Sequence, residues 1–236
     1  MLKVKSAVAG AVIAWALGPT CGASGELTGA EILQRSLAQW EHVTDFTAIA
    51  SVHMRLQDSD LPDNRARVYW KQPDKFRIEP LCGIVAIPRE ALAPARLQKF
   101  LRENADVRLL DVTESARGKT YALLVRSRTD RDLGRLRVWI NGANWTLTRM
   151  EAYEAEGARP VLTLRWRHSK VDGRHWMPTR IACEIDRPAG GGHGPLKGFA
   201  EIVLSDYRVN ANLPDSVFDK PPPSRRHARP RMRRWR

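Results

Sequence analysis

Three side chains with metal-binding chemistry lie near one another late in the sequence: His168, His175 and Cys183. Imidazole nitrogens and thiolates are zinc ligands, but zinc sites usually take their ligands in pairs about two to five residues apart. The wider spacing here fits no such pattern. Because the two histidines flank an expected hairpin loop, a solvated histidine is the ordinary outcome at both positions. The sequence therefore predicts no metal site.

The residue types used in catalysis form no better constellation. His42 and His53 have no Ser or Cys nucleophile in a recognisable context. The segment Gly190-Gly191-Gly192-His193-Gly194 lacks the Lys-Ser/Thr of a phosphate-binding loop. No nucleophile elbow is present, and the acidic residues are scattered over polar faces. The sequence predicts no catalytic residue and no cofactor, and it favours a binding protein over an enzyme.

The N-terminus has the layout of a secretory signal peptide. Lys3 and Lys5 precede an apolar run, Ala7–Leu17, that is too short for a comfortable membrane span. A cut after Ala23 satisfies the small-residue rule for the cleavage site. The alternative is lipidation at Cys21, although the preceding residues lack the usual Leu of a lipobox. We expect secretion to the periplasm.

The charge of the chain is concentrated at its C-terminus. The formal net charge is +13, but the segment Ser224–Arg236 contains seven arginines and no acidic residue. The body is only mildly basic, so we expect no nucleic-acid binding by the domain. We predict a signal peptide at 1–23, one domain at 24–220 and a disordered Arg-rich tail at 221–236. The tail Arg225–Arg236 is either a solvated end or a contact with an anionic membrane.

Two cysteines remain if Cys21 leaves with the signal peptide. In an oxidising compartment Cys82 and Cys183 could form a disulfide. The alternative is two separate buried thiols, since Cys183 lies among apolar residues in an expected strand.

Two helices are expected. Thr28 and Glu31 resemble a capping box, and the apolar residues that follow recur at helical spacing. A second helix is expected over Pro88–Ala105, with Pro94 as an alternative start, since proline is favoured at the first helical position.

The rest of the body reads as ten short strands with apolar residues on one face and polar residues on the other. Asp58–Asn64 is expected to be a polar loop, and the pairs Asn141-Gly142 and Asp172-Gly173 indicate hairpin turns. This rhythm predicts an up-and-down antiparallel sheet, strongly curved or nearly closed. The strands are expected at Phe46–Arg55, Arg65–Trp70, Phe76–Glu79, Val107–Val112, Tyr121–Arg126, Arg135–Ile140, Trp145–Tyr153, Val161–His168, Met177–Ile185 and Phe199–Tyr207.

The apolar faces of these strands are the strongest functional signal. Two helices are few to cover so many strands, so part of the inner face is expected to stay open as a hydrophobic cavity. Burial of an acyl chain contributes about 0.8 kcal/mol per methylene group, which favours a lipid ligand. The candidate ligand-cavity residues are Phe46, Val52, Met54, Val68, Trp70, Phe76, Ile78, Leu136, Val138, Ile140, Leu162, Leu164, Trp166, Ile181 and Ile202.

The order of several short motifs resembles that of a known family. They are Asp45-Phe46-Thr47-Ala48 at the first strand, Arg67–Arg77 as a strand–turn–strand, Val138-Trp139-Ile140 with Thr146–Glu151 as a middle hairpin, Asp172–Ile181 as a late strand, and Tyr207–Asn210 with Leu213-Pro214-Asp215 and Phe218 at the end. Together they resemble the outer-membrane lipoprotein carrier superfamily (LolA/LolB-like), over nearly all of the mature body.

The resemblance implies a mainly β (α+β) fold, an unclosed antiparallel β-barrel with helices plugging the concave hydrophobic face. It implies a non-catalytic role in which acyl chains of a lipoprotein or lipid are bound, with a membrane protein of the inner or outer membrane as a further partner. The first hypothesis is thus a periplasmic carrier of acylated cargo between the two membranes, a transport chaperone in outer membrane biogenesis. The alternative is an envelope sensor domain on the same fold that binds a protein partner.

Overall fold

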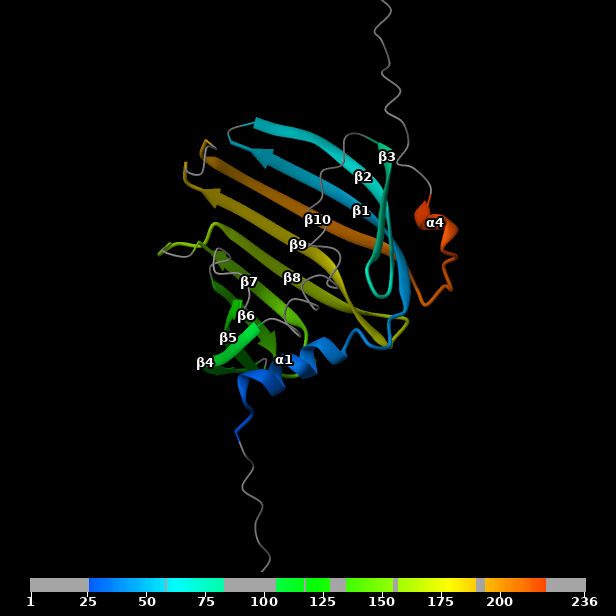
Figure 1. The fold of residues 1–236 in the computed structure, drawn as a ribbon. Coiled ribbons are helices and arrows are strands. Elements are labelled where there is room, and N and C mark those ends of the chain that lie inside the picture. The colour runs from blue at the N-terminus through cyan, green and yellow to red at the C-terminus, as the bar shows by residue number, and fades with distance from the viewer. Residues whose placement is uncertain are drawn as a thin grey trace, which may run out of the picture.

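The protein is built around a single sheet of ten antiparallel strands (Figure 1). The computed structural model describes residues 26–57, 59–82, 105–116, 118–127, 135–154, 157–189 and 194–219. The strands are Asp45–Leu56 (β1), Ser59–Lys71 (β2), Lys75–Cys82 (β3), Ala105–Ser115 (β4), Gly118–Ser127 (β5), Arg135–Asn141 (β6), Leu147–Tyr153 (β7), Leu162–Val171 (β8), His175–Arg187 (β9) and Leu196–Val209 (β10). The helices in this part of the chain are Gly29–Ala38 (α1) and Ser216–Asp219 (α4).

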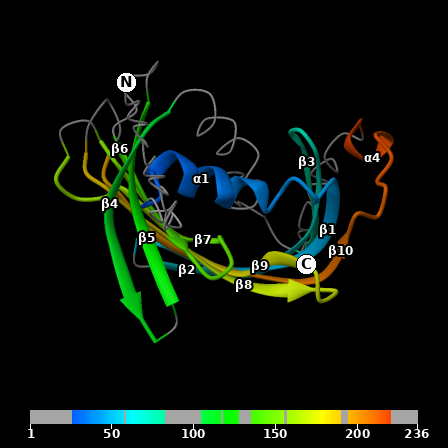
Figure 2. The same ribbon diagram turned by 90° about the horizontal axis from the view of Figure 1, so that it is seen from below.

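The strand order is β3-β2-β1-β10-β9-β8-β7-β6-β5-β4. Strands that are consecutive in sequence pair with each other, except β3 and β4, which lie at opposite edges of the sheet. The one long-range pairing joins the first strand to the last, from Phe46 opposite Val209 to Leu56 opposite Gly198. The sheet therefore has two free edges, β3 and β4, and curves without closing (Figure 2). The mainly β, unclosed and strongly curved sheet expected from the sequence is confirmed.

The expected strands all occur in order, but one expected loop is wrong. The segment Asp58–Asn64 was expected to be a loop, whereas β2 already begins at Ser59. Pro62 is tolerated because it lies in a β-bulge opposite His53, where the register shifts, and proline in sheets is confined to edges and bulges. Asn64 stabilises this bulge by donating a hydrogen bond from Nδ2 to the Pro62 carbonyl oxygen at 2.7 Å.

A second difference concerns the start of β7, which was expected at Trp145. The strand begins at Leu147, because Trp145 has a φ of 57° and belongs to the turn after β6. The turn is held by Asn144, whose Oδ1 accepts a hydrogen bond from the Thr146 hydroxyl at 2.8 Å.

The Asp172-Gly173 hairpin turn between β8 and β9 is confirmed, with positive φ angles of 50° and 65°.

Helix α1 begins with the expected capping box. The Glu31 backbone N–H donates to the Thr28 hydroxyl, while the Glu31 carboxylate accepts from the Thr28 backbone N–H at 2.8 Å. The helix packs on the concave side of the sheet, where its buried side chains Ile32, Leu33 and Leu37 join the core (Figure 2). Its first residue, Gly29, lies so close to β4 that a Cβ atom there would be 2.8 Å from the Leu109 backbone nitrogen.

The C-terminal segment closes back on the start of β1. Asp45 is buried and accepts hydrogen bonds from the backbone N–H groups of Ala211 and Leu213. Farther along, Asp215 forms ion pairs with Lys71 at 2.8 Å and Lys75 at 2.7 Å, and these two ammonium groups lower its pKa to about 2. These contacts fix the chain that follows β10 against β1, β2 and β3.

Several expectations lie outside the described residues: the signal peptide, lipidation at Cys21, the Arg-rich tail, and the second helix over Pro88–Ala105 apart from Ala105, which begins β4. The segment boundaries at 23 and 220 stay predictions. Within the part of the chain that is described, no helix is both long and apolar enough to span a membrane.

Candidate functional site

The fifteen candidate cavity residues lie on one face of the sheet. Directly opposed residues on paired strands share a face, and the register aligns Val52 with Ile202, Ile202 with Ile181, and Ile181 with Trp166. The same relation links the remaining candidates through the adjacent strand pairs. Ten are buried in the core, and Met54, Phe76, Ile78, Leu136 and Leu162 are partly buried against it. Contact of these residues with a ligand stays a prediction.

One end of this concave face is filled by aromatic rings. Trp70 is buried and stacks on Phe46, with ring centroids 5.5 Å apart. Trp40, which follows α1, meets Trp70 edge-on at 6.1 Å, and Tyr207 packs against Phe46 at 5.7 Å. The Tyr207 hydroxyl donates to the Pro178 carbonyl oxygen at 2.6 Å. We call this cluster of Trp40, Phe46, Trp70 and Tyr207 the aromatic end.

The opposite end of the same face contains a cavity of about 230 Å³. It lies at the end of β1, the start of β2 and the paired ends of β9 and β10. Its walls are mainly apolar, and of the fifteen candidates only Met54 lines it. The lining residues are Met54, Arg55, Leu56, Leu61, Cys183, Ile185, Gly198, Phe199 and Ala200. We call this the apolar cavity.

A taper in side-chain size along β10 makes this cavity. The inward-facing positions of β10 run Leu204, Ile202, Ala200 and Gly198 from the aromatic end to the cavity. The first two fill the core, whereas Ala200 and Gly198 leave space that no larger side chain occupies. This taper is visible in the sequence and is the signal of the cavity, but the predicted residues include only large apolar side chains and neither Ala200 nor Gly198.

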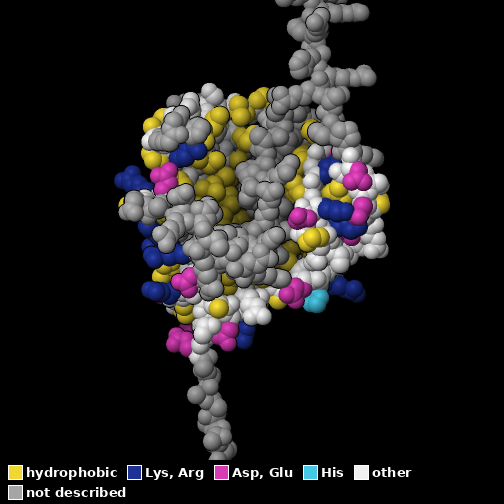
Figure 3. All heavy atoms as spheres, viewed as in Figure 1, with side chains coloured by type: hydrophobic (Ala, Val, Ile, Leu, Met, Phe, Trp, Pro, Cys, Tyr) yellow, Lys and Arg dark blue, Asp and Glu magenta, His cyan; other side chains and the backbone are white. Residues whose placement is uncertain are grey.

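Two leucines stand at the rim of the cavity. Leu56 is 45% exposed and Leu61 is 37% exposed, although both lie on the apolar side of their strands. Figure 3 looks onto the concave face and shows hydrophobic side chains gathered in a recess. Exposed apolar side chains around an apolar recess are typical of a binding site.

Val138, by contrast, is fully buried in the core. A charged residue there would be cut off from water without a partner and would destabilise the fold itself. Charge substitutions at the exposed rim, at Leu56 or Leu61, therefore test ligand binding more directly than a charge placed at Val138 would.

The two described cysteines are free. Cys82 is exposed at the end of β3, while Cys183 is buried on β9 in the wall of the apolar cavity. Burial raises the pKa of the Cys183 thiol to about 11, with a smaller contribution from the neighbouring Glu184 carboxylate. Cys183 is thus a protonated, apolar part of the cavity wall rather than a reactive thiolate.

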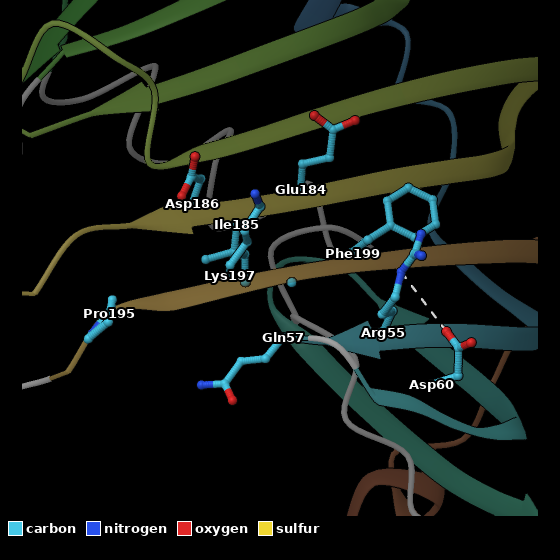
Figure 4. Close-up of a pocket in the computed structure, with 10 residues that line it drawn as sticks. Arg55, Gln57, Asp60, Glu184, Ile185, Asp186, Pro195, Lys197 and Phe199 are labelled. Carbon is cyan, nitrogen blue, oxygen red and sulfur yellow. Dashed lines mark ion pairs between the residues drawn. The ribbon is translucent and has the colours of Figure 1, made fainter.

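A larger open groove of about 780 Å³ lies on the other face of the same strand ends (Figure 4). It shares Arg55, Ile185, Gly198 and Phe199 with the apolar cavity. Its other lining residues are mostly polar or charged: Gln57, Asp60, Glu184, Asp186, Pro195 and Lys197. Arg55 and Asp60 form an ion pair at 3.9 Å, marked in Figure 4. With cations and anions interspersed, this groove suits water rather than an acyl chain.

Among the residues that the structure describes, the histidines and cysteines considered for chemistry form no metal-binding cluster. In the described ranges, no group of three or more His, Cys, Asp or Glu side chains could hold a metal ion. Burial lowers the pKa of His168 to about 4, so this imidazole is neutral at physiological pH. His53 Nδ1 lies 2.9 Å from the Asp63 carboxylate across the β2 bulge.

Known proteins resemble this chain in structure but not detectably in sequence. No protein-family model matches it, and no curated protein does. A candidate outer membrane lipoprotein-sorting protein domain from Vibrio parahaemolyticus matches with a TM-score of 0.62 at 16% identity, over 81% of this chain and 96% of that one. A LolA superfamily protein from Nitrosomonas europaea matches with a TM-score of 0.59 at 17% identity, over 83% and 99%. A DUF1329 family protein from Desulfovibrio piger matches with a TM-score of 0.59 at 17% identity, over 80% and 95%.

The chain has the LolA-superfamily fold. The matches cover nearly the whole length of each solved structure, so the resemblance drawn from the sequence motifs is confirmed for the fold as a whole. In this LolA-like fold, β3 and β4 form the two edges of the unclosed sheet, and the apolar cavity lies on its concave face.

Proposed function

We propose that this protein binds an acyl chain of a lipid or lipoprotein in the apolar cavity and acts in the periplasm as a carrier of acylated cargo. The observation that carries the proposal is the cavity itself, a recess on the concave face of a LolA-like fold, walled by apolar side chains and rimmed by two exposed leucines.

The physical case rests on the apolar area that a ligand would remove from water. Each buried methylene group contributes about 0.8 kcal/mol, and the walls formed by Met54, Ile185 and Ala200 offer no charged group to desolvate. The volume lies just below the usual range of about 300–1,000 Å³ for small-molecule sites. The cavity therefore suits a segment of one chain rather than a bundle of several.

The first test uses a matched pair of leucines. Leu56 at the rim and Leu110 on β4 are each 45% exposed, so Asp at either position should leave the fold intact. We expect Leu56→Asp to weaken the binding of a fluorescent fatty acid at least tenfold, because the acyl chain would have to pass a carboxylate. Leu110 does not line the cavity, so Leu110→Asp should change the affinity less than twofold. Equal effects of the two substitutions would reject the cavity as the binding site.

The cargo is identified by native mass spectrometry of the mature protein purified from its own envelope. A co-purifying lipid or acylated peptide supports the carrier. If the protein is purified without a lipid but in a stable complex with a polypeptide, the result supports the envelope sensor. Transfer of bound fatty acid to acceptor vesicles separates the two functions further, since a carrier releases its ligand and a sensor has no need to.

A further inference from the structure

The convex face of the sheet carries a row of arginines across β6, β7, β8 and β9. We call Arg135, Arg137, Arg149, Arg165, Arg167 and Arg180 the arginine belt. They alternate along their strands with buried core residues such as Val138, Met150 and Trp166, so they point to the opposite face from the apolar cavity.

The register brings like charges into direct opposition. Arg149 lies opposite Arg165 on the neighbouring strand, and Arg167 lies opposite Arg180. Directly opposed residues of an antiparallel pair have Cβ atoms only about 5 Å apart, and like charges there destabilise the sheet. Two such pairs on adjacent strands form an arrangement that gains stability when an anion lies over it.

The protein's own carboxylates neutralise only part of the belt. Glu151 pairs with Arg149, Glu184 with Arg165, and Glu201 with Arg180. Arg137 and Arg167 are exposed and form no ion pair in the described part of the chain. Arg137 lies opposite Glu151, but the carboxylate of Glu151 is already bound by Arg149 and the Tyr153 hydroxyl. The belt therefore keeps an excess of positive charge, and the chain's C-terminal segment, rich in arginine, has the wrong sign to neutralise it.

Aromatic rings hold several of the guanidinium groups in place. Arg149 lies 4.8 Å over the Trp139 ring, and Arg135 and Arg137 lie 4.7 Å and 5.5 Å from the Tyr153 ring. Tyr153 is itself fixed, because its hydroxyl donates to the buried Glu151 carboxylate at 2.6 Å. Side chains ordered in advance lose less entropy on binding, and a planar guanidinium suits the oxygens of a phosphate group.

We propose that the arginine belt docks the protein on a membrane surface whose lipid headgroups carry anionic phosphate. Headgroups are mobile in the plane of the membrane and can follow a curved row of cations, whereas an acidic polypeptide must match its spacing with fixed side chains. Docking through the convex face leaves the apolar cavity open to a cargo donor or acceptor. The inference goes beyond the proposed acyl-chain binding and stands without it.

The test compares two double variants of the full mature chain that lose equal charge. Arg137→Gln/Arg167→Gln removes two belt residues that form no ion pair in the described part of the chain. Arg65→Gln/Arg208→Gln removes two exposed arginines on the same face of β2 and β10, outside the belt. Binding is measured by co-sedimentation with vesicles of phosphatidylglycerol and phosphatidylcholine, and with phosphatidylcholine alone.

We expect binding to the anionic vesicles only, weakened roughly thirtyfold in the belt variant and no more than threefold in the control. Equal losses in both variants would mean that net charge alone acts and would overturn the proposal. Preferential binding of polyglutamate over the vesicles would overturn it in favour of an acidic protein partner. Fatty-acid binding should be unchanged in both variants. The experiment therefore distinguishes a failure of the membrane-docking proposal from a failure of the proposed acyl-chain binding.

Discussion

The two ends of the concave face are made by the same strands yet differ in what they leave open. At the aromatic end, β1, β2 and β10 contribute Phe46, Trp70 and Tyr207, whose rings pack against one another. At the other end, the same strands contribute Leu56, Leu61 and Gly198, which surround the apolar cavity. A strand can thus serve as core at one end and as binding wall at the other, and the size of its inward side chains decides which.

The strongest way to test this comparison is to truncate one large residue at each end. Phe46→Ala should lower the free energy of unfolding by about 3–5 kcal/mol, because a buried ring is replaced by a cavity inside a packed cluster. Leu56→Ala should change it by less than about 1 kcal/mol, because that side chain is 45% exposed. Urea unfolding measures both. Similar losses at the two positions would show that the cavity end is as tightly packed as the aromatic end.

A pH experiment sharpens the description of the aromatic end. His168 lies opposite Pro178, whose carbonyl oxygen accepts the Tyr207 hydrogen bond. Burial lowers the His168 pKa to about 4 in the folded state, against about 6.5 in the unfolded chain. The unfolded chain therefore binds the proton first as the pH falls. The contribution of neutral His168 to the stability is therefore complete above about pH 6.5 and is lost as the pH falls from about 6.5 to about 4. Below about pH 4 it changes no further.

We expect His168 to account for up to about 3 kcal/mol of that loss. Urea unfolding at pH 7.5 and pH 4.5 measures it, and His168→Gln should reduce the difference between the two pH values. A variant that keeps the full pH dependence of the wild type would place the responsible group elsewhere.

The smallest expected effect on stability comes from a substitution that fills the apolar cavity. Ala200→Leu places a larger side chain in the apolar cavity, so it should weaken fatty-acid binding about tenfold while raising stability by about 0.5–2 kcal/mol. Ala182→Leu makes the same substitution on β9, on the convex face opposite Glu201, and should leave ligand affinity unchanged. Loss of binding in both variants, or a destabilised Ala200→Leu protein, would argue against an empty cavity beside Ala200.

Most of the fold could be predicted from the sequence because alternation and turn signals are local. The ten strands, the capping box at Thr28 and the Asp172-Gly173 turn all depend on neighbouring residues. The bulge at Pro62 could not be predicted, because it depends on His53 across the strand pair. The cavity could not be predicted for a different reason: it is defined by the small residues Ala200 and Gly198, and an apolar strand pattern indicates where side chains fill space rather than where they leave it open.

The pairing of β1 with β10 also bears on when the sheet can form during synthesis. The register places Phe46 opposite Val209, residues separated by most of the domain, so the centre of the sheet cannot form until nearly all of the polypeptide is available. Contacts of such high sequence separation slow folding. In a nascent chain of this topology, the centre of the sheet therefore forms only after β10 has been synthesised.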